Sequence, residues 1–259
     1  EINIFRLEDH VARLQMSSKI MCIENNVNES IILDAILSLI NANNISEDSY
    51  VRVVLLVDDE GSWHQLGPSK MLVTLVPRPR HEINNLPHYT ANVSSWTRID
   101  DNMMPPRVKA GANYINSRYG FLQAKKDGYD LPIFLDRNGK VSESSGSCLF
   151  IIRDGTLFTP PLSSSVLESI TRSCIFNLAE DLNLPLIERN IDRTELYISD
   201  EVFLCGSAVE ISPIVSIDQY SIADGLPGSL SCLLLQKYLE IVSNPDDKYS
   251  RWVKSVSIL

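Results

Sequence analysis

Apolar residues recur at helical spacing in several stretches of this chain, and each stretch predicts an amphipathic helix. The predicted helices cover residues 7–14, 29–42, 112–127, 165–183, 192–197 and 227–242. Two of them also carry boundary signals. Ser165 and Glu168 have the spacing of a capping box, which predicts a helix start after Ser165. Gly128 follows another of these helices, and a left-handed residue is expected there.

Runs of β-branched and apolar residues between these helices predict strands. The predicted strands cover residues 50–57, 71–76, 91–99, 131–136, 140–143, 149–152, 156–158, 201–205 and 211–217. Asn138-Gly139 and Asp154-Gly155 each separate two of these strands, and both dipeptides are typical of tight hairpin turns. The chain therefore combines helices with hairpins, and it contains no internal repeat.

One segment interrupts this pattern and predicts a linker. Pro77-Arg78-Pro79-Arg80 has two prolines in three residues, which favours a stiff extended connection. We therefore predict a small N-terminal domain over residues 1–77, a linker over 78–88 and a large domain over 89–259.

Composition and charge exclude some classes of binding partner and indicate a cellular location. The chain has 259 residues, 44% of them hydrophobic and 22% charged, and a formal net charge of −10. Nucleic acids and anionic membrane surfaces require a basic face, so neither is an expected partner. Five scattered cysteines without a C-x-x-C pair indicate a reducing, cytoplasmic location. His81 and His88 are too far apart to share a helix face, with Pro87 between them, and metal binding is not expected.

Lys109 is the first candidate for chemistry. It follows Pro105-Pro106-Arg107-Val108 and precedes three small residues at the start of a predicted helix. A buried lysine at such a junction can lose its proton and attack carbonyls, including the aldehyde of pyridoxal phosphate. A lone lysine is more often a solvated surface charge, so this interpretation depends on the rest of the chain.

Three further features fit a phosphorylated pyridine. Ser163-Ser164-Ser165 precede Ile170 and Thr171 at a predicted helix start. The amides and hydroxyls of this segment could bind a phosphate, or the segment could be an ordinary serine-rich helix start. Glu143 could keep a pyridine nitrogen protonated, or be a solvent charge on an edge strand. The turn Gly206-Ser207-Ala208 could offer amides to an anion, or be a plain bend.

Five strings follow one another along the chain. They are Lys109–Tyr114, Val141–Gly146, Ile170–Arg172, Asp200–Phe203 and Gly206–Pro213. In this order they resemble the fold type IV pyridoxal-phosphate enzymes, specifically the branched-chain amino acid aminotransferase group of the class IV aminotransferases. The resemblance extends from about Phe5 to Trp252.

The resemblance implies an α+β fold with the two-domain architecture of fold type IV. We expect a small N-terminal α/β domain that lacks its first strands, and a larger C-terminal domain with a pseudo-barrel sheet and packed helices. The expected cofactor is pyridoxal 5'-phosphate, the expected partners are an amino acid and a 2-oxo acid, and a homodimer is expected.

The resemblance also implies roles for single residues. Lys109 forms the Schiff base with the cofactor and shuttles the proton, Glu143 pairs with the pyridine nitrogen, and Tyr114 binds the ring hydroxyl. Arg13 matches the family's phosphate-binding arginine. The remaining cofactor-binding residues that it implies are Leu167, Ile170, Thr171 and Ser207.

On the substrate side, the resemblance implies that Tyr50 and Arg52 line the pocket, with Arg52 binding a carboxylate through both of its oxygens. The amides of Ser207 and Ala208 would meet the α-carboxylate. Three segments depart from the family pattern. Asp58–Trp63 does not resemble its glycine-rich pocket loop, the linker Pro77–His81 lacks the aromatic residue usually found there, and Ser147-Cys148 replaces the usual Glu-Asn.

The predicted activity is transfer of an amino group from an L-amino acid, branched-chain-like or otherwise hydrophobic, to a 2-oxo acid such as 2-oxoglutarate. Lys109 serves both halves of this ping-pong reaction. Two alternatives stay open. One is a lyase of the same fold, of the aminodeoxychorismate lyase type, and the other is a catalytically silent homologue that binds the cofactor.

Overall fold

The computed structural model describes residues 2–257, which form two compact units. One unit contains the described residues up to Arg80 together with those from Glu240 onward, and the other contains His81–Leu239. The domain limits predicted at residues 77 and 89 stay a prediction. No helix among residues 2–257 is long and apolar enough to span a membrane.

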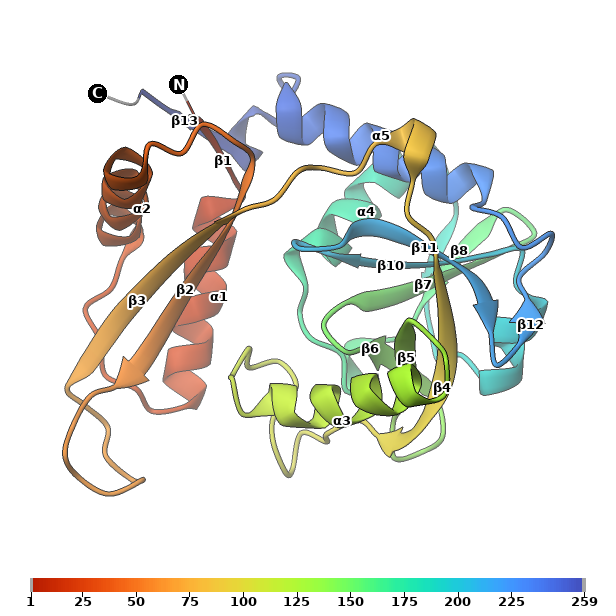
Figure 1. The fold of residues 1–259 in the computed structure, drawn as a ribbon, viewed down its shortest axis with the longest axis horizontal. Helices are drawn as coiled ribbons and strands as arrows, with labels where there is room; N and C mark the ends of the chain where they lie inside the picture. Colours follow the sequence, from red (N-terminus) through yellow and green to blue (C-terminus); the bar gives the residue numbers. More distant parts are fainter. Residues whose placement is uncertain (1, 258–259) are drawn as a thin grey trace. The chain divides into compact units, whose positions relative to one another are not determined.

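The first unit combines two helices with a β-hairpin and a pair of strands (Figure 1). Its elements are β1 (Ile2–Phe5), α1 (Leu7–Ile20), α2 (Glu29–Asn43), β2 (Ser49–Val57), β3 (Ser69–Pro77), η4 (Ser250–Trp252) and β13 (Val253–Val256). β1 pairs with β13 in an antiparallel register, and β2 pairs with β3 along its whole length. The strand at the start of the described chain is therefore paired with the last one.

Helix α2 shows why these residues fold as the pattern predicts. The Asn28 side chain accepts a hydrogen bond of 3.0 Å from the Ile31 amide and so caps the first turn. Ile32, Ile36 and Ile40 recur at helical spacing and are buried against the hairpin. The helix ends at Asn43, and its C-cap, Asn44, has a left-handed φ of 50°.

The second unit is built on a nine-stranded sheet. Its strands are β4 (Tyr89–Thr97), β5 (Leu131–Leu135), β6 (Val141–Ser144), β7 (Cys148–Arg153), β8 (Thr156–Thr159), β9 (Leu186–Glu188), β10 (Glu201–Gly206), β11 (Glu210–Ile217) and β12 (Tyr220–Ser221). The strand order is β6-β5-β4-β11-β10-β7-β8-β9, with β12 on β11. The end of β6 also meets the start of β7, where the Ser144 amide donates to the Ser147 carbonyl at 2.9 Å. The sheet therefore curls into a half-barrel (Figure 1).

Helices cover this sheet. They are η1 (Ile83–Asn85), α3 (Asn113–Lys126), η2 (Leu162–Ser164), α4 (Ile170–Asp181), η3 (Arg193–Ile198) and α5 (Ser229–Ser243). α3 packs on β4 and β5, and α4 packs on β10. The Glu201 carboxylate, at the start of β10, caps α5 by accepting from the amides of Leu230 and Ser231 at 2.9 and 2.7 Å.

Both predicted hairpin turns are present. Gly139 has a φ of 74°, and Asp154 and Gly155 have φ values of 49° and 71°. These left-handed backbone conformations explain why Gly and Asp occupy the turns, because residues other than Gly, Asn and Asp rarely adopt them.

The predicted helix start after Ser165 is wrong. Helix α4 begins at Ile170, and its N-cap is Ser169, whose hydroxyl accepts from the Arg172 amide at 3.2 Å. Ser165 instead has a left-handed φ of 64° at the end of η2, whereas an N-cap residue needs an extended backbone. Ser165 and Glu168 therefore do not form a capping box.

Candidate active site

The lysine candidate lies in a loop that is fixed on both sides. The loop joins β4 to α3, and Pro106 and Val108 anchor it by being buried. The side chain of Asn113, at the start of α3, donates back to the carbonyls of Pro105 and Val108 at 3.1 and 2.9 Å. The side chain of Lys109 itself is exposed, although Pro106 and Val108 on either side of Arg107 are buried. Its amine lies 5.7 Å from the centre of the Tyr114 ring.

Glu143 is a buried carboxylate rather than a solvent charge. It lies on β6 and is 3% exposed, although β6 ends the strand order. Its Oε1 accepts from Arg98 Nη2 at 2.6 Å, and its Oε2 accepts from the Leu167 amide at 3.2 Å. Burial raises the pKa of Glu143, while the Arg98 guanidinium, the Leu167 hydrogen bond and the charge of Lys109 lower it. Burial is the largest of these effects, so the pKa of Glu143 stays above its ordinary value, and the carboxylate lies within electrostatic reach of the lysine amine.

The sequence analysis missed Arg98. This arginine directly follows β4 and is buried, and its Nη1 donates to Asn116 Oδ1 and Ser117 Oγ at 3.2 and 3.1 Å. α3 thus orients the guanidinium that holds Glu143 in place. The available signal was a basic residue inside the strand predicted over residues 91–99, but its partner lies 45 residues further along the chain.

Cys148, which departs from the family pattern, lies directly beside this carboxylate. Its Sγ is 3.9 Å from Glu143 Oε2 and 3.7 Å from the Leu167 carbonyl oxygen. Burial, together with the charge of Glu143, raises the pKa of the Cys148 thiol to about 12. The thiol is therefore neutral and acts as a weak donor at this site.

The first turn of α4 has the features that the predicted phosphate site requires. Thr171 is 2% exposed, and the amides of Ile170 and Thr171 belong to the helix start, where amides have no partner within the helix. The positive end of the helix dipole also favours a phosphate there. The Leu167 amide that binds Glu143 lies three residues before this turn, so the carboxylate and the helix start are physically connected.

Two glycines lie where the remaining segments contact one another. A Cβ on Gly206 would lie 3.4 Å from the Gly146 carbonyl oxygen, and a Cβ on Gly146 would lie 3.8 Å from Tyr114 Cε1. The turn that carries Ser207 and Ala208 therefore packs against the loop that follows Glu143, which in turn lies against Tyr114. These contacts link the segments that carry the candidates of the second unit, and the roles of the single residues stay predictions.

Three candidates belong to the first unit. Arg13 lies half-buried on α1, with Nη2 3.5 Å from His10 Nδ1. Tyr50 and Arg52 alternate along β2 with Val51 and Val53, which pack on the helices, so they lie on the opposite face of the hairpin. Their predicted roles toward phosphate and substrate stay predictions.

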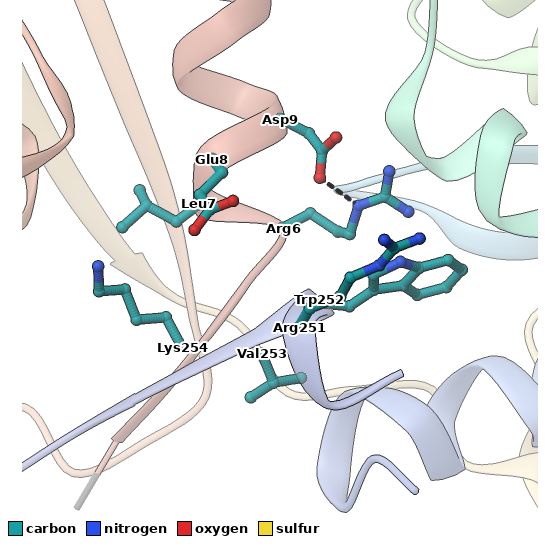
Figure 2. Close-up of a pocket in the computed structure, with 8 residues that line it drawn as sticks. All are labelled: Arg6, Leu7, Glu8, Asp9, Arg251, Trp252, Val253 and Lys254. Carbon is teal, nitrogen blue, oxygen red and sulfur yellow. Dashed lines mark hydrogen bonds and ion pairs between the residues drawn. The ribbon is translucent and has the colours of Figure 1, made fainter. Parts of the chain in front are cut away.

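A separate hollow of about 200 Å³ lies in the first unit (Figure 2). In it the Arg6 guanidinium lies 4.3 Å above the Trp252 ring, and Arg6 Nε donates to Asp9 at 2.5 Å. The hollow is lined by residues 6–9 and 251–254, which do not include the candidates from the sequence. Among residues 2–257, no group of three or more His, Cys, Asp or Glu side chains is placed to hold a metal ion.

Comparison with known proteins identifies the class. A family model described as amino-transferase class IV matches residues 1–217. Branched-chain-amino-acid aminotransferase of Salmonella typhimurium is 32% identical over 98% of this chain and 84% of its own length. The enzyme of Escherichia coli K12 is also 32% identical, with the same coverage of both chains. The chain therefore belongs to the class IV aminotransferases, the pyridoxal-phosphate enzymes that its sequence strings resemble.

Solved structures agree with this assignment. The branched-chain amino acid aminotransferase of Thermobaculum terrenum in its PLP form has a TM-score of 0.89 and 38% identity, over 97% of this chain and 83% of that chain. The branched-chain aminotransferase of the archaeon Thermoproteus uzoniensis with norvaline has a TM-score of 0.88 and 35% identity, over 97% of this chain and 84% of that chain. The predicted family, fold class, aminotransferase activity and cofactor are confirmed.

Proposed function

We propose that this chain transfers the amino group of a branched-chain or other hydrophobic L-amino acid to a 2-oxo acid such as 2-oxoglutarate, using pyridoxal 5'-phosphate. The observation that carries the proposal is the buried Glu143 carboxylate, paired with Arg98 and within electrostatic reach of the Lys109 amine. The names of the relatives, which are branched-chain aminotransferases, support the substrate class.

The residues present fit the cofactor by their chemistry. Glu143 would pair with the pyridine nitrogen, Tyr114 would bind the ring hydroxyl, and the first turn of α4 would hold the phosphate. Leu167, Ser207 and Arg13 complete the proposed set. When bound, the cofactor supplies an electron-withdrawing ring that stabilises negative charge on the substrate α-carbon.

Lys109 performs the proton transfer in this proposal. Its amine takes the proton from the α-carbon of the amino acid and later returns a proton to complete the transfer. Burial raises the pKa of Glu143, and Arg98 and the Leu167 amide oppose this by favouring the charged form, which is the form that pairs with a protonated pyridine nitrogen.

The substrate side rests on four residues. Arg52 binds a carboxylate with both of its terminal nitrogens, and Tyr50 lies two residues before it on the same face of β2. The amides of Ser207 and Ala208 bind the α-carboxylate. Asp58–Trp63, which departs from the family pattern, is the segment where the donor preference of this chain is expected to differ.

We also propose a cytoplasmic homodimer. The free cysteines support a reducing compartment. A dimer is supported by exposed apolar side chains around α3, including Trp96 stacked on Tyr119 with ring centres 4.9 Å apart, and the exposed Ile115. Sedimentation velocity should give a single dimeric species, and a monomer at micromolar concentration would contradict the proposal.

An absorbance titration tests the proposed activity. Pyridoxal 5'-phosphate added to the purified protein should produce a visible absorption band, which leucine, isoleucine or valine should bleach and 2-oxoglutarate should restore. Chromatography should then show one glutamate formed for each donor consumed. Pyruvate release from aminodeoxychorismate without amino transfer would favour the lyase alternative. A stable band that no donor bleaches would favour the silent homologue.

A further inference from the structure

Arg107 connects the two loops on which the proposed cofactor site depends. It lies two residues before Lys109, and its Nη1 donates to Glu168 Oε1 at 2.8 Å. Its Nε also lies 3.5 Å from Asp101 Oδ1 within its own loop. Glu168 in turn lies two residues before Ile170, the first residue of α4. One ion pair therefore joins the lysine loop to the start of the phosphate-site helix.

Glu168 poses an electrostatic problem at this position. A carboxylate beside a helix start is attracted to the same positive end that would hold the phosphate. It would also repel a phosphate dianion bound there. The N-cap of α4 is the hydroxyl of the neighbouring Ser169.

We infer that Arg107 is a positioning residue for the cofactor phosphate. It neutralises Glu168 and draws its carboxylate toward the Lys109 loop, away from the first turn of α4. The inference rests on the proposed assignment of that turn as the phosphate site.

An ordinary surface ion pair is the competing explanation, and the chain contains a matched one. The side chains of Arg107 and Glu168 are 46% and 36% exposed, while those of Lys125 and Asp130 are 46% and 42% exposed and lie 3.2 Å apart. Lys125 lies near the C-terminal end of α3, and Lys109 precedes the N-terminal end of this helix. Lys125→Ala therefore removes a comparable pair at a distance from the site.

The test measures binding of two ligands that differ only by the phosphate, pyridoxal 5'-phosphate and pyridoxal. Arg107→Ala should raise the Kd for pyridoxal 5'-phosphate by about threefold to tenfold. The same variant should change the Kd for pyridoxal by less than about twofold, because pyridoxal carries no phosphate charge. Arg107→Ala combined with Glu168→Gln should restore the Kd for pyridoxal 5'-phosphate to near the wild-type value, and Lys125→Ala should leave both values unchanged.

Each other outcome identifies what failed. Equal weakening of both ligands by Arg107→Ala, no weakening at all, or no restoration in the double variant overturns the role of Arg107. If wild-type protein binds pyridoxal as tightly as pyridoxal 5'-phosphate, the phosphate-site assignment itself is wrong. If wild-type protein prefers the phosphorylated ligand and Arg107→Ala leaves that preference intact, only the inference about Arg107 fails.

Discussion

Lys109→Ala is expected to reduce transamination by at least about 10²-fold and up to about 10⁴-fold, because it removes the amine that carries the proton between substrate and cofactor. The fold should be unaffected, since the Lys109 side chain is exposed and the loop is held by Val108 and Asn113. Steady-state rates with leucine and 2-oxoglutarate measure the effect, and circular dichroism verifies the fold.

Two controls separate a lost amine from a lost charge. Lys109→Arg keeps a positive charge near Glu143 but cannot release a proton at neutral pH, so it should be as inactive as the alanine variant. Lys125→Ala removes an exposed lysine from α3 and should retain wild-type activity. A Lys109→Ala variant that transaminates at the normal rate would refute the assignment of this lysine.

Glu143→Ala is expected to lower the free energy of unfolding by about 3–5 kcal/mol, because it leaves the Arg98 guanidinium buried without its carboxylate. Both side chains of the pair are buried and their atoms lie 2.6 Å apart, so water cannot replace the carboxylate without a cost in free energy. Urea unfolding followed by fluorescence measures this loss. Lys125→Ala, which breaks the exposed pair with Asp130, should change the free energy of unfolding by less than about 1 kcal/mol.

Glu143→Gln separates the structural effect from the chemical one. An amide keeps the size of the side chain and can still accept from Arg98, but it carries no charge to hold a proton on the pyridine nitrogen. Activity should therefore fall by about 10²- to 10³-fold, with a smaller loss of stability than in the alanine variant. Full activity of the glutamine variant would mean that Glu143 does not serve the ring nitrogen.

Local signals in the sequence predicted local structure well. Helix α2 and both hairpin turns depend on residues within a few positions of one another, such as Asn138-Gly139 with its left-handed glycine. The start of α4 was misplaced because Ser165 and Ser169 are both acceptable caps by residue type. Backbone conformation decides between them, and the sequence does not specify it.

Contacts between distant segments could not be predicted from the pattern. Arg98 binds Glu143 because β5 lies between β4 and β6 in the curled sheet. Hydrophobic periodicity predicts single strands but not the order of strands in a sheet. The same limit applies to the pairing of β1 with β13. The candidates themselves were found because five strings resemble a known family, and their proximity in the second unit was then established by the structure.

The neutral thiol of Cys148 allows the opening of the site to be measured by thiol labelling, without substrate or cofactor. Alkylating reagents attack thiolates. Cys148 can therefore react only when the sheet around Glu143 opens and the pKa of the Cys148 thiol returns toward its ordinary range. Cys22 is exposed and reacts from the closed state, which provides an internal reference in the same molecule. The ratio of the two labelling rates therefore reports how often the carboxylate that serves the cofactor is exposed to solvent.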